Sequence, residues 1–394
     1  MGLSSARRIY TSIFENEIHE SLRQEVRTFA EQHVRPWVSS FGRNVKLIDD
    51  LTRHIASLGW IGATIPKRYG GPALGAVVQA SQLGVAKVVH FGSEEQKQKW
   101  LPLFAKGASL PTIAVTERDS GGDVLGMQST AQRDSNEYIL NGHKCFVGNS
   151  HIGDVHGVVM RTGQGARGLS AFLVERTRPG FAAGQLGDQA GMHGFSYGEL
   201  LFDNCRVPEQ NRLGREGDGL SVAYSSSVLY GRPNLTAVAL GIHQAIFDDT
   251  VRFCQERQHR GAPLSKLPTI AAMVGEMLSR LCTARMIAYQ AVAMLDRGEK
   301  CDAELMNAKL VNTENALSSA RVAMEIFAAR GCQRDYSIER YLLDVLHTFP
   351  AAGTSDIQRL RLAQIAFGTY GEAWSSQLRE HIRLATDHQL KSPP

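Results

Sequence analysis

Two short segments carry the side chains most able to do chemistry. Tyr230 and Arg232 flank a glycine in VLYGRPNL, and TERDSGG places three charged residues and two glycines in a turn after Thr116. Arg232 has either a structural role at a helix start or a role in an active site, and the sequence leaves both open. Tyr230 could act as an acid or base, although a phenol with a pKa of about 10 is a poor base at neutral pH.

Motifs for hydrolytic and metal chemistry are absent from the sequence. The chain has no HExxH, no GxSxG and no P-loop. Its six cysteines form no CxxC pair, and its scattered histidines complete no zinc spacing. We therefore expect reduced, buried thiols and no metal site.

The composition is that of an ordinary globular protein. The chain has 394 residues and a net charge of +4, with 43 basic and 39 acidic residues. This charge is too small and too mixed to indicate nucleic-acid binding. No apolar stretch approaches the ~20 residues of a membrane-spanning helix, and MGLSSARRIYTSIFENE lacks the apolar core of a secretory signal. We expect a cytoplasmic protein without nucleic-acid or membrane partners.

The apolar pattern predicts an α+β fold in three domains. Residues 1–110 have helical spacing, first over 17–38. Residues 111–215 alternate as strands between Gly, Asn and Asp turns and predict a central antiparallel β domain. Residues 216–394 return to helical spacing and predict a bundle. The expected helices of this last part lie near 219–260, 268–297, 302–330, 337–348 and 355–385.

Six segments, in this order, resemble the acyl-CoA dehydrogenase family. They are IPKRYGGPALG, HFGSEEQKQKWLPLFAKG, AVTERDSGGDVLGMQSTA, YILNGHKCFVGN, LFDNCRVPEQNRLGREGDGL and ERYLLDVLHTFPAAGTSDIQR. They are similar to the family's IPxxYGG, FGTEEQKxKYLP, AxTEPxAGSD and YxLNGxKxFxTN motifs, the end of its β domain, and its ExxxRDxxxxxIYEGTSEIQR motif. The resemblance covers nearly the whole chain. It implies an N-terminal helical domain, a central β domain and a C-terminal four-helix bundle.

The resemblance also implies flavin chemistry on an acyl thioester. In the family, FAD lies between the β domain and the bundle, and a carboxylate removes the α-proton while the flavin takes the β-hydride. The cofactor supplies the redox chemistry and the protein orients it. Family members are usually homodimers or homotetramers, so we expect a homo-oligomer.

Both family positions for the catalytic base lack a carboxylate in this chain. Ala352 stands where the YEGT stretch has its Glu, and Gly231 stands at the alternative position before Arg232. The nearest carboxylates in this part of the sequence are Asp344 and Asp356. Asp344 matches a structural Asp of the family, and we do not expect either residue to be a relocated base.

Several positions that contact FAD in the family have also changed. Gly148 replaces a Thr that reaches the flavin, Gly122 replaces a Ser, and Glu325 replaces a Gln in the segment EIFAARG, where two glycines have become alanines. The segment between Gly71 and Phe91 is shorter than the family's helix. The resemblance still implies a set of cofactor-binding residues: Thr116, Gly121, Gly122, Phe146, Gly148, Arg257, Gly353 and Thr354.

Three functions remain open at this point. The first is a divergent FAD-linked oxidoreductase that acts on an acyl thioester, with Arg232 and Tyr230 as candidate catalytic residues. The second is a protein of this fold without FAD that catalyses a non-redox step, and the third is a non-catalytic subunit. SSVLYGRPN resembles the branch that acts on carrier-protein thioesters in polyketide pathways, and Leu229 stands where the CoA-using branch has an Asp. We expect the first function, on an acyl thioester of CoA or of an acyl-carrier protein, or on a specialised-metabolite intermediate.

Overall fold

The computed structural model describes residues 17–41, 44–58, 60, 79–371 and 373–376. They form two compact units, which we describe separately: a sheet unit of residues 28–189 and 193–234, and a helical unit of residues 17–27, 190–192 and 235–376. The IPKRYGG loop and the predicted end of the last helix, to 385, lie outside the described residues. The three-domain boundaries stay a prediction.

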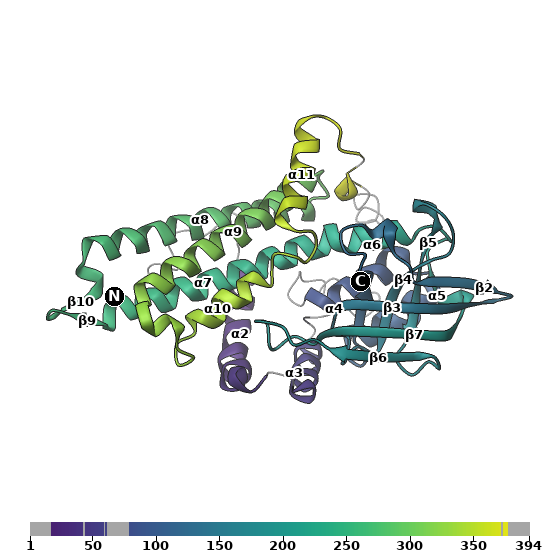
Figure 1. Ribbon diagram of the computed structural model, residues 1–394, viewed down its shortest axis with the longest axis horizontal. Coiled ribbons are helices and arrows are strands. Elements are labelled where there is room, and N and C mark those ends of the chain that lie inside the picture. Colours follow the sequence, from purple (N-terminus) through teal and green to yellow (C-terminus); the bar gives the residue numbers. More distant parts are fainter. Residues whose placement is uncertain (1–16, 42–43, 59, 61–78, 372, 377–394) are drawn as a thin grey trace. The chain divides into compact units, whose positions relative to one another are not determined.

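The sheet unit is built on one eight-stranded sheet with the order β6-β7-β3-β2-β4-β5-β8 (Figure 1). Its longest pair, β3 and β7, is antiparallel, as expected. β1 lies off this order and pairs in parallel with β4, with Thr112 opposite His156, so the β domain is not wholly antiparallel. The strands are β1 Pro111–Ala114, β2 Thr130–Asp134, β3 Glu137–Gly148, β4 Val155–Arg161, β5 Leu169–Glu175, β6 Phe181–Leu186, β7 Tyr197–Pro208 and β8 Arg212–Leu213.

A buried lysine joins helix α4 (Gln79–Phe91) to the β1–β4 pair. Lys87 Nζ donates to Thr112 O at 3.3 Å and also to Gly157 O. A side chain at Gly157 would place its Cβ 2.3 Å from that nitrogen, so the glycine makes room for the lysine. Burial lowers the pKa of Lys87 well below its ordinary value.

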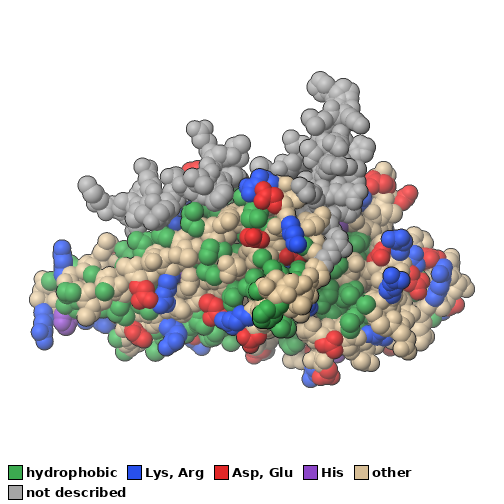
Figure 2. Space-filling view, turned by 90° about the horizontal axis from the view of Figure 1, so that it is seen from above, with side chains coloured by type: hydrophobic (Ala, Val, Ile, Leu, Met, Phe, Trp, Pro, Cys, Tyr) green, Lys and Arg blue, Asp and Glu red, His purple; other side chains and the backbone are tan. Residues whose placement is uncertain are grey.

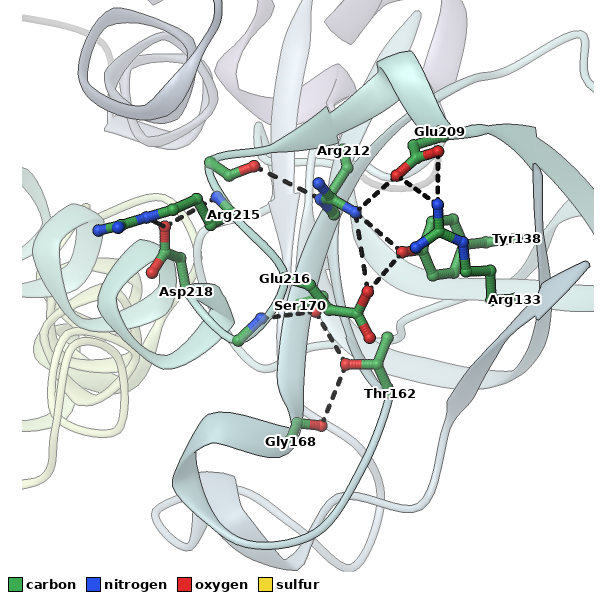
Figure 3. Close-up of polar contacts among 12 residues, drawn as sticks. Arg133, Tyr138, Thr162, Gly168, Ser170, Glu209, Arg212, Arg215, Glu216 and Asp218 are labelled. Atoms are coloured by element: carbon green, nitrogen blue, oxygen red, sulfur yellow. Dashed lines mark hydrogen bonds and ion pairs between the residues drawn. The ribbon is translucent and has the colours of Figure 1, made fainter. Parts of the chain in front are cut away.

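A polar network fixes the end of β7 and β8 against β3 (Figure 3). The Tyr138 hydroxyl donates to Glu216 at 2.8 Å and accepts from Arg212 at 2.9 Å. Arg212 also donates to Glu209, whose two carboxylate oxygens accept from Arg133 at 2.9 and 2.8 Å. Two arginines and two glutamates thus satisfy one another around the Tyr138 hydroxyl.

The N-terminal helices differ in one respect from the expectation. The predicted helix over 17–38 is α-helical only in α2 (Glu17–Phe29) and continues as π-helix η1 (Ala30–Val34) and 3-10 helix η2 (Arg35–Ser40). Pro36 explains the change, because its nitrogen cannot donate a hydrogen bond. Helix α3 (Val45–Ser57) follows, and α5 (Glu94–Ala105) begins with the expected capping pair of Ser93 and Gln96.

The helical unit consists mainly of long helices that run side by side (Figure 1). Its core joins Ile246 and Phe247 to Met277, Leu281 and a row of small residues on the next helix. The prediction of one helix over 355–385 is wrong: α11 ends at Ala366, and Gly368 follows in the left-handed conformation that commonly ends a helix. The elements are α7 Arg232–Glu256, strands β9 Gln258–His259 and β10 Ala262–Pro263, α8 Pro268–Asp296, α9 Asp302–Phe327, 3-10 helix η10 Ala328–Cys332, α10 Ile338–Leu346 and α11 Ser355–Ala366.

The surface agrees with the mixed charge of the sequence. Figure 2 shows Lys and Arg side chains next to Asp and Glu side chains on the face that it presents. Among the described helices, none combines the length and the apolar character that a bilayer crossing requires.

Candidate active site

Glu117 of the TERDSGG turn forms a buried ion pair with Lys144 in the sheet unit. Lys144 has no exposed surface and its Nζ lies 2.7 Å from Glu117 Oε1. Glu117 also accepts from the backbone nitrogens of Gln128 at 2.6 Å and Ser129 at 3.0 Å. Burial alone would raise the pKa of Glu117, but the charge of Lys144 and these hydrogen bonds outweigh it and lower the pKa. The carboxylate is therefore ionised and holds the turn in place.

The two glycines of this turn present open backbone. Gly121 and Gly122 are exposed, and a Cβ built on either would meet no other atom within 4 Å. A ligand can therefore approach the peptide groups here more closely than it could if side chains covered them.

Phe146 and Gly148 lie at the end of β3, and Cys145, the residue before Phe146, contacts Thr116. The backbone nitrogen of Cys145 donates to Thr116 O at 2.9 Å, which ties the two segments together. Phe146 has a φ of +55° at an irregularity of the β3–β7 pairing, and its ring is 59% exposed. The ring stacks on Tyr197 at a centroid distance of 5.8 Å. This gives the sheet unit a solvent-facing aromatic surface beside the glycine turn.

Tyr230 lies in a π-helical segment, η8 (Ser226–Gly231), which follows α6 (Gly219–Ser225). Its hydroxyl lies 2.8 Å from His90 Nε2. Burial raises the pKa of Tyr230, so the phenol is protonated at neutral pH and can donate a hydrogen bond but cannot serve as a base. Sequence reasoning missed His90, because nothing in the pattern around α4 links it to a residue 140 positions away.

Arg232 is the first residue of α7 and is only 6% exposed. The helical path of α6 and η8 runs directly into it, and the two alternatives for Arg232, a structural role at this helix start or a role in an active site, stay predictions. Pro233 lacks an N–H, which favours the loosened π-helical turn before it. π-helical segments of this kind occur frequently at functional sites. Gly231, the alternative base position, is buried inside this segment.

The loop with Ala352 is held rigidly in the helical unit. The buried Lys309 Nζ donates to Phe349 O at 2.9 Å and also to Gly353 O. Gln358 Nε2 donates to Ala352 O at 2.9 Å and Gly353 O at 3.0 Å. Ala352 has a φ of +52°, and Thr354 caps α11 by accepting from its third residue at 3.3 Å. Hydrogen bonds hold the backbone on both sides of Ala352, but the side chain at this position is only a methyl group.

Both carboxylates near Ala352 in the sequence make structural contacts. Asp344 accepts a hydrogen bond from the backbone nitrogen of Met192 within the helical unit. Asp356 is exposed and pairs with Arg359 at 3.0 Å. Both carboxylates are thus occupied by structural contacts.

The remaining predicted residues lie at the other end of the helical unit. Arg257 is exposed between α7 and β9. Glu325 and Ala328 are also exposed, and Ala328 has a φ of +51°, a backbone conformation that glycine adopts more readily. Arg257, Gly353 and Thr354 therefore belong to the helical unit, and the other candidates belong to the sheet unit.

This architecture matches one protein family along the chain. The family's N-terminal, middle and C-terminal domain models, each described as acyl-CoA dehydrogenase, match residues 16–81, 112–205 and 217–367. The chain belongs to the acyl-CoA dehydrogenase family. An acyl-CoA dehydrogenase of Bacillus subtilis is 32% identical over 369 residues, which cover 88% of this chain and 97% of the relative.

Solved structures of the family share the fold. The prolyl acyl carrier protein oxidase AnaB has a TM-score of 0.82 and 28% identity, over 89% of this chain and 99% of its own. A structure of PigA with FAD and proline has a TM-score of 0.83 and 25% identity, over 92% of this chain and 100% of its own. The expected fold of helices, sheet and helices is confirmed.

Proposed function

We propose that this protein is an FAD-dependent oxidoreductase that acts on an acyl thioester without the family's glutamate base. The observation that carries the proposal is the 349–354 loop. Lys309 and Gln358 hold it in an ordered conformation, yet Ala352 offers no proton acceptor. The buried Gly231 offers none either. The chain thus keeps the family's architecture and lacks carboxylates at both positions from which the α-proton is removed.

The residues of the two units are compatible with FAD. Thr116, the open glycines Gly121 and Gly122, and the exposed ring of Phe146 near Gly148 supply backbone groups and an aromatic surface of the kind that a flavin contacts. In the helical unit we assign the same role to Arg257, Gly353 and Thr354. When bound, FAD would supply the capacity to accept a hydride. The FAD in the PigA structure supports this assignment.

The chain's own side chains then bind and orient the substrate. We assign Arg232, a buried cation beside Gly231, to the active site. Tyr230 stays protonated because of its raised pKa, so it acts as a hydrogen-bonding partner of His90 rather than as a base. We therefore do not assign the removal of the substrate's α-proton to Tyr230.

A carrier-protein thioester is the substrate class that we favour over CoA. Leu229 is 4% exposed and apolar, so it offers no carboxylate to a CoA arm where the CoA-using branch has an Asp. AnaB, which acts on a prolyl acyl carrier protein, supports the same choice. A carrier-protein substrate is typical of a biosynthetic pathway of polyketide type, and we propose that the protein acts in one. We also propose a cytoplasmic location and a homodimer or homotetramer, as the family resemblance implies.

A second function is favoured by one observation. Ala328 keeps a φ of +51° although it carries a methyl group, and exposed Glu325 lies on the same segment. Both changes disfavour binding of a pyrophosphate, since the methyl group limits close approach and the carboxylate repels a phosphate. This observation supports an FAD-free protein that catalyses an elimination, cyclisation or isomerisation, or a non-catalytic subunit.

Anaerobic reduction of the bound flavin tests the proposal. The flavin-loaded protein is mixed with one acyl group presented either on a carrier-protein phosphopantetheine or on CoA, and the flavin absorbance is followed. We expect faster bleaching with the carrier-protein thioester, and slower bleaching in Arg232→Gln than in Arg232→Lys. Bleaching by NAD(P)H alone, with thioesters inert, would contradict a dehydrogenase and indicate an oxygenase.

A further inference from the structure

We propose that His143, Cys145 and Glu199 form a binding site for a zinc-class divalent cation on the sheet unit. These three side chains are assigned no role by the family resemblance, so the proposal is independent of the flavin chemistry. His143 and Cys145 belong to β3, and Glu199 lies on the neighbouring strand β7. One ligand atom from each residue lies within 4.8 Å of the other two.

The pairing of the two strands explains why the side chains converge. His143 and Cys145 are two residues apart, so their side chains leave the same face of β3. His143 pairs with Leu201 and Lys144 with Leu200, but the next pair is Val147 with Gly198. Cys145 and Phe146 therefore oppose the single residue Glu199, which is the geometry of a β-bulge. The bulge turns Phe146 outward and leaves the Cys145 thiol beside the carboxylate.

Two of the three distances between the ligand atoms fit tetrahedral coordination, and the third, from Cys145 to Glu199, is within 4.8 Å. Zinc bonds of about 2.0–2.3 Å to N, O and S place two ligand atoms about 3.4 Å apart for an N–O pair and about 3.6 Å apart for an N–S pair. His143 Nε2 lies 3.2 Å from Glu199 Oε2 and 3.7 Å from Cys145 Sγ. The same imidazole nitrogen is thus at coordination spacing from both partners.

The surroundings orient the ligands and leave one position open. The backbone nitrogen of Gln185 donates to Glu199 Oε2 at 3.2 Å, an outer contact of the kind that fixes a metal-binding carboxylate. The His143 side chain is 39% exposed, so water or a small ligand can reach a fourth position. A site with three protein ligands and one open position is typical of reactive rather than purely structural zinc.

The charges balance when the metal is bound. A divalent cation with a thiolate, a carboxylate and a neutral imidazole has no net charge. The metal-bound site therefore does not repel the neighbouring Arg118, which lies 3.8 Å from Glu199. Because the thiolate is the form of cysteine that binds zinc, coordination releases the thiol proton of Cys145 to solvent as the sulfur–metal bond forms.

Cobalt substitution tests the site directly. Tag-free protein is treated with a chelator, freed of it, and titrated with Co²⁺ while the visible and near-ultraviolet difference spectrum is recorded. We expect one Co²⁺ per chain, with tetrahedral ligand-field bands at red wavelengths where oxidised flavin does not absorb, and a thiolate-to-cobalt band. Zn²⁺ should displace the cobalt and remove both features.

Variants identify the ligands. Cys145→Ser should abolish the thiolate band, and Glu199→Gln should weaken binding by at least about tenfold, since even an outer partner contributes that much. The matched control is Cys332→Ser, which removes an exposed cysteine and should leave the spectrum unchanged. Wild-type protein that binds no Co²⁺ would overturn the proposal, and so would a folded Cys145→Ser protein that keeps the thiolate band. The three residues would then form only a hydrogen-bonded cluster.

Discussion

Replacing Lys144 by methionine is expected to destabilise the protein by about 3 to 5 kcal/mol, the cost of removing one partner from a buried ion pair. Lys144 has no exposed surface, and its Nζ lies 2.7 Å from Glu117 Oε1. In the variant, water therefore cannot reach Glu117 to solvate its charge in place of the lysine. The substitution leaves an ionised carboxylate with only the two backbone donors of Gln128 and Ser129. Because Glu117 anchors the TERDSGG turn, flavin retention should fall as well.

A double-mutant cycle separates the pair from its surroundings. Urea unfolding, followed by circular dichroism, gives the free energy of unfolding for wild type, Lys144→Met, Glu117→Gln and the double variant. We expect the double variant to lose less stability than the two single variants added together, with a coupling energy of about 2 to 3 kcal/mol for residues in direct contact. Additive losses would refute the reasoning, because they would show that the two side chains stabilise the fold independently.

The Glu117–Lys144 pair also predicts that the free energy of unfolding depends on pH. The pKa of Glu117 is lowered from its ordinary value of 4.5 in the folded protein, so its ionisation contributes stability above that pH. The contribution is lost as the pH falls through the lower folded value. The stability difference between wild type and Glu117→Gln should therefore shrink on acidification below pH 4.5 and stay constant above it.

Three further substitutions probe other parts of the account. Ala352→Glu should give faster flavin reduction by a simple acyl-CoA than Ala352→Gln, which has similar size and no charge; equal rates would mean that this position does not reach the substrate. Lys309→Met should cost about 1.5–3 kcal/mol in thermal unfolding, because its charged hydrogen bonds to the 349–353 carbonyls are lost, and unchanged stability would argue against a rigid loop. For Lys87, burial lowers the pKa, so the folded state binds fewer protons than the unfolded state up to pH 10.5. The stability of wild type relative to Lys87→Met should therefore rise as the pH is raised toward that value, and a falling difference would contradict the buried neutral amine.

Local patterns predicted much of the fold. The alternating segments between 111 and 215 are strands, and Ser93 with Gln96 caps a helix as expected, because these signals act between neighbouring residues. The helix predicted to reach residue 38 is α-helical only to Phe29, because Pro36 interrupts the hydrogen bonding of the turns before it. The parallel pairing of β1 with β4 was not predicted, because strand direction depends on the path of the chain between the strands.

In the candidate sites too, the sequence predicts local features but not contacts between residues far apart in the chain. The assignment of Ala352 and Gly231 to the family's base positions depends on sequence motifs alone and stays a prediction. The contact of His90 with Tyr230 could not be predicted, since it joins residues far apart in the chain. The spacing of His143 and Cys145 fits no metal motif, and their convergence with Glu199 depends on a bulge that only the strand register reveals.

The most direct test of the central claim is the visible absorption spectrum of the purified protein, with the released flavin quantified after denaturation. The account predicts flavin bands, about one FAD per chain, and bleaching by an acyl thioester under anaerobic conditions. A colourless protein that also fails to bind added FAD would contradict it, and would place the chemistry of this chain among the non-redox functions of the same fold.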